Sequence, residues 1–568
     1  MKMSELKNTG KVFGIDLGTT YSCIAYIDEN NKPVVVKNSE GELTTPSVVY
    51  FETKEDVTVG ESAKESSKMY PDEVVSFIKR SMGKPNSNLK INGVEMSPPE
   101  ISSYILKKVV NDAIENLRIE GKLKEDETIK DVVITCPAYF GINERTATQT
   151  AGELAGLNVI QIINEPTAAA ITYGVADDSN EKTVLVYDLG GGTFDVTMIH
   201  IQPGEIKVIC TGGDHNLGGK DWDDKILIYL DDEFQKQTGK KESVLDDPET
   251  LQELVLSTEK AKKLLTSKEK APISINYMGE RVRIELTRQK FDELTNDLLE
   301  RTISLTEDIF IEAEKKGYSK SSVSEILLVG GSSKMPQVAK RVKEAFNIST
   351  KMFDPDESVA KGAALYADRK NEYNILLDEI AEKTGKSKEE LKIELDTSKA
   401  SINDLAEKAN IDISEKKYLG SADDIKISNV SSRSFGTVAY NQNKELKLFN
   451  LIMKNDTLPK EATDIFFPSK GAQKNVNIQV LENLSSDKAI DPSLGTEVGA
   501  VKLDLPPGMD EKTPIEITFK LNEEGLLELR AVERKNNTFI EAKFETKEGL
   551  NEEEMSDALQ RVEDSSIS

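Results

Sequence analysis

Two short loops in the chain combine glycine, threonine and aspartate between apolar runs. The first reads "GIDLGTTYS" and holds Asp16, Gly18, Thr19, Thr20 and Tyr21; the second reads "VYDLGGGTFDV" and holds Asp188, Gly190, Gly191, Gly192, Thr193 and Asp195. Glycine lets backbone N–H groups approach phosphate oxygens that a side chain would block. Threonine hydroxyls add donors, and carboxylates suit a hydrated magnesium ion. The two loops together predict a clamp on a polyphosphate chain.

One such loop alone would also fit a plain β-hairpin with a glycine turn. The repeat of the pattern, with a third glycine turn at Gly330 and Gly331, favours the phosphate interpretation. Both loops share a strand, Asp-Leu-Gly, a hydroxyl-rich turn and a returning strand, which indicates an internal duplication. No G-x-x-x-x-G-K-[ST] run occurs, so a P-loop is excluded.

The residues around the loops alternate between strand and helix patterns. "DVVITCP" predicts a strand, "NERTATQTAGELAG" a helix closed by Gly156, and "SEILLVGGSSKMPQVAKRVKEAF" a strand, a turn and a helix. Turns from strand to helix leave backbone N–H groups where an anion can sit. The fold class predicted for this part is α/β.

The length of 568 residues predicts roughly three or four domains. We expect an α/β domain over 1–369 and an antiparallel β domain over 428–545. Between them, 370–427 is rich in Glu, Lys and Asp, and we favour charged helices plus a linker over a wholly mobile linker.

The composition excludes several classes of function. A formal net charge of -27 would repel nucleic acid and anionic lipid, and no apolar run is long enough to span a bilayer. With only two histidines, His200 and His215, triads and zinc sites have almost no material, so catalysis should rest on carboxylates, lysines and backbone amides. The N-terminus has no leader pattern, and Cys23, Cys136 and Cys210 are expected as buried free thiols in a reducing cytoplasm.

Several motifs together carry a resemblance to a known family. "GIDLGTTYS", "ITCPAYF", "IINEPTAAAITYG", "VYDLGGGTFDV", "GGDHNLGGKDWD", "LLVGGSSKMP" and "DPDESVAKGAA" resemble the nucleotide-binding domain of the DnaK-type heat-shock chaperones, the heat-shock protein 70 family. This resemblance covers Val12 to Ala367 and implies an α/β actin-like ATPase fold with two duplicated lobes. The part from Ser428 to Glu545 resembles the family's peptide-binding β-sandwich more loosely, through "NLIMKNDTLP", "NVNIQVLEN" and "NEEGLLELRA".

The resemblance implies ATP and ADP as ligands and assigns the catalytic residues. Asp16, Asp188 and Asp195 would hold magnesium, potassium and the attacking water, and Thr193 would lie beside the γ-phosphate. Lys79, in "SFIKRSMG", matches the catalytic lysine, and Glu165, in "NEPTAAA", the acid that contacts magnesium-bound water. Without the resemblance, Lys79 would be interpreted as a surface lysine on an amphipathic helix, and Glu165 as an acid at a helix N-terminus.

A second set of residues is implied to bind the rest of the nucleotide. Four of them, Glu259, Lys262, Lys263 and Thr266, lie on one helical face, where a solvated charged stripe is the alternative. The remaining contacts are Ser332, Lys334 and Asp356, together with the glycines and threonines of the three turns. Lys263 and Lys334 stand where relatives often have arginine, which stacks better on a flat ring, so we expect adenine to be held less tightly.

The resemblance also implies polypeptide binding and interdomain coupling. Val476 matches the base of the peptide pocket, with Tyr440 and Ser469 near the arch over it; the alternative is that Val476 is a core valine of a β-sandwich. Pro137 and Arg145 match the interdomain switch. The implied partners are extended or unfolded polypeptides, a J-domain co-chaperone and a nucleotide-exchange factor, with no nucleic acid and no membrane, and the chain is expected to be a monomer.

Four features depart from the family pattern. The linker stretch 425–430 contains Lys426, Ser428 and Asn429 where relatives have leucines and an acid, so we expect weaker docking of the linker. Gln161 stands where relatives use an arginine to engage J-domain partners. The segment 370–427 has no counterpart in typical members, and 546–568 resembles only the start of the lid helices, so we expect a truncated lid helix and tail there.

Two other classes of function remain open at this stage. A sugar or acetate kinase could use the same ATPase fold, but it would need a carboxylate for its substrate in the cleft. A non-hydrolysing adaptor or filament protein is also compatible with the fold, although Lys79 and Thr193 would then be superfluous. The leading hypothesis is a magnesium-dependent ATPase coupled to polypeptide binding.

Overall fold

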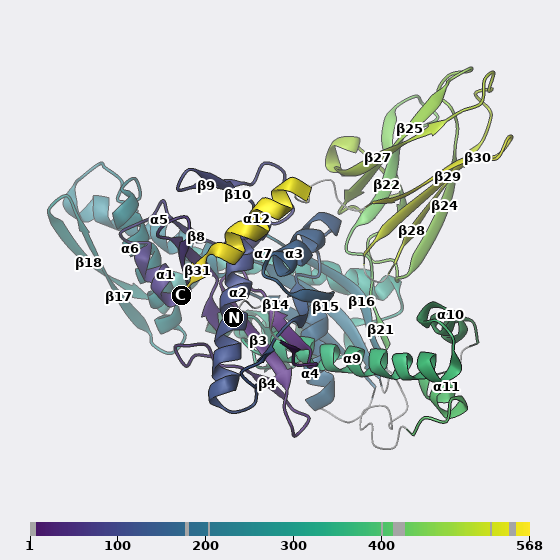
Figure 1. Ribbon diagram of the computed structural model, residues 1–568. Coiled ribbons are helices and arrows are strands. Elements are labelled where there is room, and N and C mark those ends of the chain that lie inside the picture. Colours follow the sequence, from purple (N-terminus) through teal and green to yellow (C-terminus); the bar gives the residue numbers. More distant parts are fainter. Residues whose placement is uncertain are drawn as a thin grey trace.

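The computed structural model describes residues 7–176, 181–202, 205–398, 401–412, 426–522, 525–544 and 552–568. The chain is a mixed α/β protein with several separate sheets. In Figure 1 the helices and sheets of the N-terminal part lie together, and the C-terminal strands extend to one side as a separate layered unit. None of the described helices is long and apolar enough to cross a membrane.

The first large sheet has the strand order β13-β12-β2-β3-β4, with β5 also paired to β3. Strands β2 and β3 form an antiparallel hairpin, and β12 runs parallel to both β2 and β13. The strands are β2 (Phe13–Asp16), β3 (Tyr21–Ile27), β4 (Pro33–Val35), β5 (Thr45–Pro46), β12 (Asp131–Cys136) and β13 (Asn158–Asn164). The predicted loop after Asp16 is the turn of this hairpin.

The second large sheet repeats the same order and directions, β20-β19-β14-β15-β16, with β21 added at its edge. The hairpin is now β14–β15, and β19 runs parallel to β14 and to β20. The strands are β14 (Lys182–Leu189), β15 (Phe194–Gln202), β16 (Glu205–Asp214), β19 (Val323–Val329), β20 (Thr350–Met352) and β21 (Lys426–Ser428). The repeated topology agrees with the internal duplication predicted from the two loops.

Helices cover both faces of the two sheets. Between the sheets, α4 (Glu165–Ala176) and α9 (Ser358–Thr384) share one core with strands of both. The outer face of the first sheet packs on α2 (Pro98–Ile119) and α3 (Ile142–Leu154). The outer face of the second sheet packs on α5 (Gly219–Thr238), α6 (Pro248–Leu265), α7 (Arg288–Lys315) and α8 (Pro336–Phe346).

Smaller elements complete the N-terminal part. A four-stranded sheet has the order β31-β7-β6-β8 and carries α1 (Glu61–Ser66). Its strands are β6 (Val48–Phe51), β7 (Asp56–Val59), β8 (Val74–Ser76) and β31 (Ser566–Ile567). Three two-stranded sheets are β1 (Lys7–Asn8) with β11 (Glu127–Thr128), β9 (Leu89–Ile91) with β10 (Val94–Met96), and β17 (Lys270–Tyr277) with β18 (Glu280–Thr287).

The segment expected to contain charged helices is helical where it is described. Helix α9 runs through the boundary placed at 369 and continues to Thr384, followed by α10 (Lys388–Ser398) and α11 (Ile402–Lys408). These three elements enclose a small apolar core that includes Leu376, Leu391 and Leu405. Residues 413–425, in the predicted linker, lie outside the described residues.

Two C-terminal sheets pack face to face on one core, and we call them the C-terminal sheet pair (430–544). One sheet has the order β26-β23-β22-β25-β27 and the other β24-β28-β29-β30. The strands are β22 (Ser434–Tyr440), β23 (Leu446–Ile452), β24 (Lys460–Phe466), β25 (Asn475–Asn483), β26 (Ala489–Ile490), β27 (Thr496–Asp504), β28 (Ile515–Leu521), β29 (Leu527–Glu533) and β30 (Thr538–Phe544). Ile142, at the start of α3, belongs to the same core, so the sheet pair is docked on the N-terminal part.

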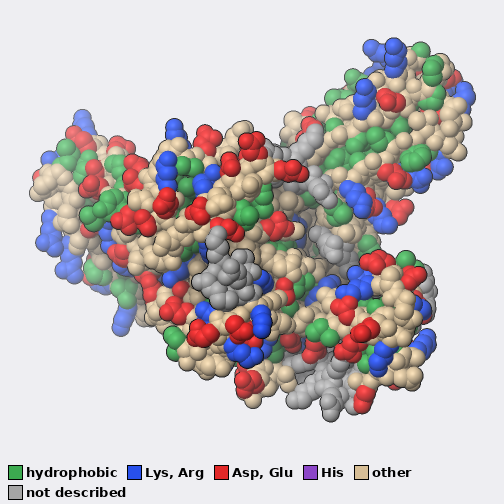
Figure 2. Space-filling model, in the orientation of Figure 1, with side chains coloured by type: hydrophobic (Ala, Val, Ile, Leu, Met, Phe, Trp, Pro, Cys, Tyr) green, Lys and Arg blue, Asp and Glu red, His purple; other side chains and the backbone are tan. Residues whose placement is uncertain are grey.

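The last described segment is α12 (Glu552–Asp564) followed by β31. Both elements lie against the N-terminal part, beside α2, α3 and β7 (Figure 1). Acidic and basic side chains are interspersed over the visible face of the molecule (Figure 2).

The crossing of α9 over α4 depends on Gly362, because a Cβ there would lie 1.8 Å from the carbonyl oxygen of Ala168. We expect Gly362→Ala to destabilise the protein by about 1–3 kcal/mol through overpacking of rigid backbone. Gly174→Ala on α4 is the matched control, since its Cβ would make an ordinary 3.5 Å contact with Ile201. Urea unfolding followed by the single tryptophan, Trp222, measures both. Equal midpoints for the two variants would contradict the close-packing argument.

Candidate active site

A cleft of about 480 Å³ opens between the two hairpin turns. Its walls come from both large sheets, from α6 and from the turn η4 (Gly331–Lys334). It is lined by Asp16, Gly18, Thr19, Thr20, Tyr21, Cys23, Thr44, Lys79, Glu165, Asp188, Gly190, Gly191, Thr193, Glu259, Lys262, Lys263, Thr266, Gly330, Gly331, Ser332, Lys334, Met335, Pro355, Asp356 and Val359. The structure therefore brings together the three glycine turns that the sequence singles out.

The two hairpin turns touch each other directly. A Cβ on Gly191 would lie 1.6 Å from Thr20 Oγ1, and one on Gly192 would lie 2.3 Å from Thr19 Cγ2. No larger residue could hold the turns at this separation. Glycine at both positions is thus required for the turns to face one another across the cleft.

The carbonyl oxygens of the second turn are already engaged by neighbouring donors. Gly190 and Gly191 accept hydrogen bonds from the first amides of α5 at 3.0 and 2.8 Å, and Gly192 accepts one from Arg80 Nε at 2.9 Å. Backbone N–H groups are therefore the polar groups that this turn can offer to an anion.

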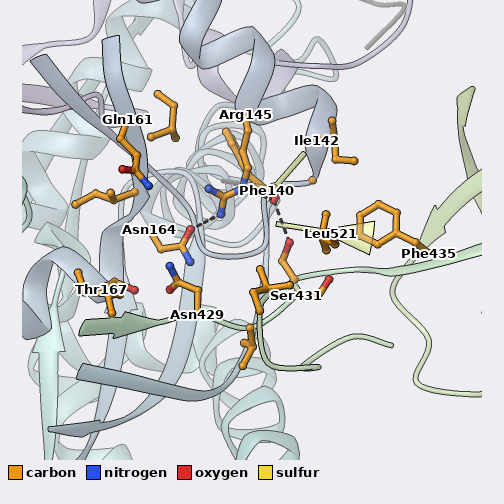
Figure 3. A pocket seen from close by; sticks show the side chains of 18 of the residues that line it. Phe140, Ile142, Arg145, Gln161, Asn164, Thr167, Asn429, Ser431, Phe435 and Leu521 are labelled. Carbon is orange, nitrogen blue, oxygen red and sulfur yellow. Dashed lines mark hydrogen bonds between the residues drawn. The ribbon is translucent and has the colours of Figure 1, made fainter. Parts of the chain in front are cut away.

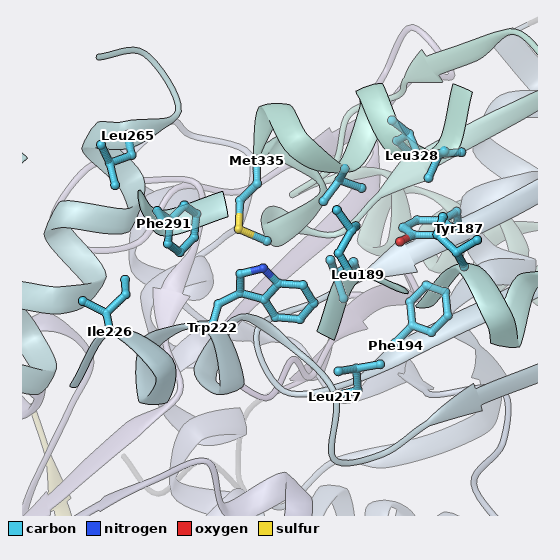
Figure 4. Close-up of a cluster of buried hydrophobic side chains, with 14 of the residues drawn as sticks. Tyr187, Leu189, Phe194, Leu217, Trp222, Ile226, Leu265, Phe291, Leu328 and Met335 are labelled. Atoms are coloured by element: carbon cyan, nitrogen blue, oxygen red, sulfur yellow. The ribbon is translucent and has the colours of Figure 1, made fainter. Parts of the chain in front are cut away.

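The turn is supported from below by a packed apolar core (Figure 4). Leu189 and Phe194, on either side of the turn, are fully buried with Trp222 of α5. Because both ends of the turn are fixed in this core, its backbone is held in position before any ligand arrives.

Lys79 lies on the short 3-10 helix η2 (Ile78–Ser81), which follows Phe77 in the left-handed region at φ 60. Its ammonium group is 2.6 Å from Glu165 Oε1 and also donates to the carbonyl of Leu17. Burial alone would lower the pKa of Lys79, but Glu165 and Asp16 outweigh that effect and raise it. The interpretation of Lys79 as a solvated lysine on an amphipathic helix is therefore wrong.

Three aspartates surround this ion pair and lack a full set of counter-charges. Burial, followed by the negative charge of Glu165, raises the pKa of Asp16 to about 7. The same two causes, in the same order, raise the pKa values of Asp188 and Asp195 well above the usual range. One lysine cannot compensate four buried carboxyl groups, so the cluster is suited to an added cation.

The arrangement favours an ion that keeps its water. Within the described ranges, no three His, Cys, Asp or Glu side chains lie close enough together to ligate one metal ion directly. Magnesium usually retains several waters and binds through one or two carboxylates plus phosphate oxygens. Both carboxylate oxygens of Asp195 are sealed from solvent with only a weak backbone interaction from Ala138, which fits a water held at that position.

The outer wall of the cleft is tied together by charges around Tyr21. Glu259 on α6 pairs with Lys64 on α1 at 2.5 Å and with Lys263 at 2.8 Å. Tyr21 donates to Glu259 at 3.2 Å and accepts from Lys263 at 2.7 Å. Although burial would raise the pKa of Glu259, Lys64 and Lys263 lower it to about 2. The charged face of α6 is thus an ion-pair network, and Lys64 links it to α1.

Two more lysines are held in defined positions. Lys262 donates to Asp223 at 2.6 Å and to the carbonyl of Gly219 at 2.8 Å, and burial raises the pKa of Asp223 to about 6. Lys334 on η4 pairs with Asp356. Both lysines therefore stand at the cleft wall with a carboxylate beside them.

Most of the site residues named from the sequence line the cleft, and a few do not. Gly192 and Asp195 are not in its wall: Gly192 packs on Thr19, and Asp195 lies behind the wall with 1% exposure. Sequence reasoning missed Thr44, Met335 and Val359, because single residues in ordinary strand, turn and helix patterns carry no signal of a cleft.

A second, smaller cavity of about 60 Å³ lies where the C-terminal sheet pair meets the N-terminal part (Figure 3). Arg145 lines it and donates to Asn164 and, at 3.2 Å, to the carbonyl of Phe140. The same carbonyl accepts a hydrogen bond from Ser432 at 3.1 Å. Pro137 is linked to this group because its carbonyl accepts the amide of Phe140 at 3.1 Å.

The linker is docked in spite of its polar residues. Strand β21 pairs in parallel with β16, and Ser428 Oγ donates to Glu205 at 3.1 Å. Farther along β16, Asn455 accepts the amide of Thr211 at 3.0 Å. The backbone hydrogen bonds between β21 and β16 are contacts that an estimate from apolar side-chain area does not include.

Gln161, which stands where relatives use an arginine, also lines the cavity and accepts a hydrogen bond from Tyr366 at 2.7 Å.

The three residues named for peptide binding lie in the C-terminal sheet pair at separate positions. Val476 shares the inner face of β25 with Ile478 and is partly buried against the core. Tyr440 ends β22 with 61% of its surface exposed. Ser469 lies in the loop after β24 and donates to Gln473 at 3.3 Å.

A cleft lined by three glycine turns between two repeated α/β sheets, joined to a pair of β-sheets, defines the class of the protein. The family model described as Hsp70 protein matches residues 12–378 and 417–567, so the chain belongs to the Hsp70 family.

Two relatives give the scale of the similarity. The chain is 44% identical over 363 residues to the chaperone protein DnaK of Thermosipho melanesiensis (strain DSM 12029 / CIP 104789 / BI429), covering 63% of this chain and 59% of that protein. It is 42% identical over 363 residues to the chaperone protein DnaK of Thermosipho africanus (strain TCF52B), covering 63% and 58%. The match thus spans less than two thirds of the length of these curated relatives.

The Lys64–Glu259 ion pair joins α1 to α6 across the mouth of the cleft. We expect Lys64→Met to speed nucleotide release about five- to tenfold, which corresponds to about 1 kcal/mol, because a partly buried link is lost. Stopped-flow release of a fluorescent ADP analogue measures this rate. Lys54→Met, at an exposed position outside the lining of the cleft, is the control. Equal release rates in wild type and Lys64→Met would show that this pair does not close the cleft.

Proposed function

We propose that the protein is an ATP-dependent molecular chaperone, in which magnesium-dependent hydrolysis of ATP is coupled to binding and release of extended apolar polypeptide segments. The observation that carries the proposal is the buried Lys79–Glu165 pair among three aspartates, at the bottom of a cleft built from two facing glycine turns. Family membership supports the same activity. We propose that the protein acts in the cytoplasm as a monomer.

The fold that accompanies this function is an actin-like ATPase domain of two duplicated lobes, followed by a peptide-binding β-sandwich. The repeated strand order of the two large sheets supports the duplication. The shared core of the C-terminal sheet pair supports the sandwich. The shared core between the two large sheets, made by α4 and α9, would be the hinge region between the lobes.

Within the cleft, the two turns would bind the phosphates of ATP or ADP through backbone amides and the hydroxyls of Thr19, Thr20 and Thr193. The ion-pair network of α6 would hold the ribose and adenine, with Ser332, Lys334 and Asp356 on the facing wall. Asp16 and Asp188 would hold magnesium, which would neutralise phosphate charge there. Potassium is proposed as an additional ion in the same carboxylate cluster.

Lys79 would act on the reacting phosphate as a fixed positive charge. Its pKa is raised, so it stays protonated and cannot serve as a base at neutral pH. A buried cation next to the transferred group stabilises charge in the transition state more than in the ground state. Asp195 would orient the attacking water, Glu165 would contact magnesium-bound water, and Thr193 would lie beside the γ-phosphate.

The C-terminal sheet pair would bind polypeptide as an extended segment. Exposed large apolar side chains gather on it, including Tyr440, Leu446, Ile465, Phe467 and Phe539. One client side chain would be buried near Val476, worth roughly 1.5–3 kcal/mol. A J-domain co-chaperone and a nucleotide-exchange factor are proposed partners.

A short route connects the two sites. Glu165 contacts Lys79 in the cleft, and the preceding residue, Asn164, accepts from Arg145 at the cavity beside the sheet pair. Pro137 and Arg145 would act as the interdomain switch along this route. A shift of Glu165 on ligand binding would therefore reach the sheet pair through Asn164, Arg145 and the carbonyl of Phe140, which also accepts from Ser432.

Removal of the Lys79 charge tests the catalytic assignment. We expect Lys79→Ala to lower ATP turnover about a hundred- to thousandfold while ADP affinity changes little, because the charge acts mainly in the transition state. Lys84→Ala, an exposed lysine in the same segment, should retain turnover. Phosphate release and calorimetric ADP titration measure the two quantities. Wild-type turnover in Lys79→Ala would exclude the residue from the mechanism.

Peptide binding tests the second half of the proposal. We expect an extended apolar peptide to bind weakly and exchange fast, with only modest differences between ATP and ADP, because α12 lies against α2 and α3 and leaves the sheet pair without a lid from the described part of the chain. Val476→Ala should weaken binding by about 1 kcal/mol, roughly fivefold in Kd.

Fluorescence anisotropy in both nucleotides gives affinity and dissociation rate, and Asn477→Ala, exposed on the same strand, is the control. Tight, slow binding or a large release on adding ATP would contradict the expected weak coupling. No binding at all would favour the interpretation of Val476 as a plain core residue.

A further inference from the structure

Two consecutive basic residues of η2, Lys79 and Arg80, reach one glycine turn each. Lys79 donates to the carbonyl of Leu17, at the start of the first turn. Arg80 Nε donates to the carbonyl of Gly192, in the second turn, at 2.9 Å. The short helix thus contacts the backbone of both turns that face each other across the cleft.

A carboxylate holds each of these two basic side chains. Lys79 pairs with Glu165 at 2.6 Å. Arg80 Nη2 donates to one carboxylate oxygen of Asp221 at 2.6 Å, and Nη1 donates to the other at 3.4 Å. Asp221 lies in the first turn of α5 and also accepts the amide of Gly218 at 2.8 Å. The three hydrogen bonds of Arg80 therefore all end on the second hairpin turn or on α5.

These contacts join two different cores. The helix η2 packs in the core of the first sheet through the buried side chain of Ile78. Asp221 is followed by Trp222, which is fully buried in the core of the second sheet. The hydrogen bonds of Lys79 go to the first turn and to α4. Arg80 thus links η2, and Lys79 with it, to the second turn.

The second turn has other contacts that hold its own shape. The carbonyls of Gly190 and Gly191 accept amides of α5, and the amide of Gly190 donates to the carbonyl of Thr193 at 3.0 Å. The two turns touch each other through threonine side chains packed on glycine backbone, which limits their approach but does not prevent their separation. Loss of Arg80 would therefore leave the amides of the turn in place and release the spacing between this turn and η2.

We propose that Arg80 is a positioning residue for the hydrolysis of ATP, which sets the distance of Lys79 from the second glycine turn. The assignment rests on the function proposed for Lys79, because Arg80 itself lies outside the lining of the cleft. On that turn Thr193 would lie beside the γ-phosphate, so a shift of η2 would move the ammonium group of Lys79 away from the reacting phosphate. A misplacement of about 1 Å can cost roughly a hundredfold in rate.

Single-turnover hydrolysis of MgATP by the full chain tests the assignment, because product release does not enter that rate. We expect Arg80→Met to lower the rate about ten- to a hundredfold, while the Kd for MgADP from calorimetry changes by less than about twofold. Arg80→Lys keeps the charge but not the fork of donors, so its rate should lie between those of wild type and Arg80→Met. Asp221→Asn removes the partner charge, keeps an acceptor for the Gly218 amide and should lower the rate at least about fivefold.

A double variant separates positioning from a general structural role. Adding Arg80→Met to Lys79→Ala should lower the residual rate by less than about twofold, because the group that Arg80 positions is already gone. The matched control is Arg341→Met. Arg341 donates to Glu300 at 2.6 and 2.8 Å, joins α8 to α7 outside the lining of the cleft, and should be replaceable at the wild-type rate. Urea unfolding followed by Trp222 checks that each variant is folded.

Three results would overturn the proposal. The first is a wild-type rate in Arg80→Met. The second is a further loss of about tenfold or more when Arg80→Met is added to Lys79→Ala, because Arg80 would then act without Lys79. The third is a loss of MgADP affinity as large as the loss of rate, since Arg80 would then hold the cleft closed in the ground state.

The proposed function and the role of Arg80 can fail separately. Each of the three results can occur while Lys79→Ala still loses turnover, and it then contradicts the role of Arg80 alone. Wild-type turnover in Lys79→Ala would contradict the catalytic part of the proposed function and, with it, the need to position that lysine.

Discussion

The buried ion pair between Lys79 and Glu165 is the constraint on which the site depends. A lysine with 4% exposure must be compensated, and the carboxyl groups around it overcompensate, since the pKa of Asp16 is raised to about 7. The folded cleft therefore carries an excess of buried acid that protonation or an added cation relieves. The facing glycine turns and the packed core that includes Leu189 and Phe194 hold these buried carboxyl groups close together. Binding of a hydrated cation with a polyphosphate then completes an arrangement that the protein alone leaves unbalanced.

The same constraint joins the cleft to the rest of the chain. Asn164 and Glu165 are consecutive at the end of β13 and the start of α4, yet one faces the cavity beside the sheet pair and the other the cleft. Since β13 is held in the sheet and α4 in the core between the sheets, a movement of the shared peptide unit would displace both side chains together. Coupling between the two ends of the molecule can thus pass through rigid elements and needs no disordered intermediate.

Much of the fold could be predicted from the sequence, because local patterns determine it. The hairpin turns, the charged face of α6 and the strand-turn-helix at Gly330 follow from spacing alone. The burial of Lys79 could not, since it depends on the turn at Phe77 and on a partner 86 positions away. The contact of α12 with Glu100 joins residues 461 positions apart, and no periodicity reports on it. Residues that long-range packing brings into the site, such as Met335, were missed for the same reason.

The linker shows which interactions a count of apolar area leaves out. Where relatives have leucine, this chain has Lys426 and Ser428, which offer less apolar surface. Burial of that apolar surface would stabilise docking of the linker. However, a strand added to a sheet edge also satisfies backbone groups on both strands, and an unmade backbone hydrogen bond in a buried edge costs about 1–3 kcal/mol. Strand β21 gains this ladder on β16 whatever its side chains are, and Ser428 adds a hydrogen bond to Glu205 that leucine could not make. Strand β31 on β7 uses the same device at the other end of the sheet pair. Main-chain pairing thus attaches to the N-terminal part both the strand before the sheet pair and the strand after it.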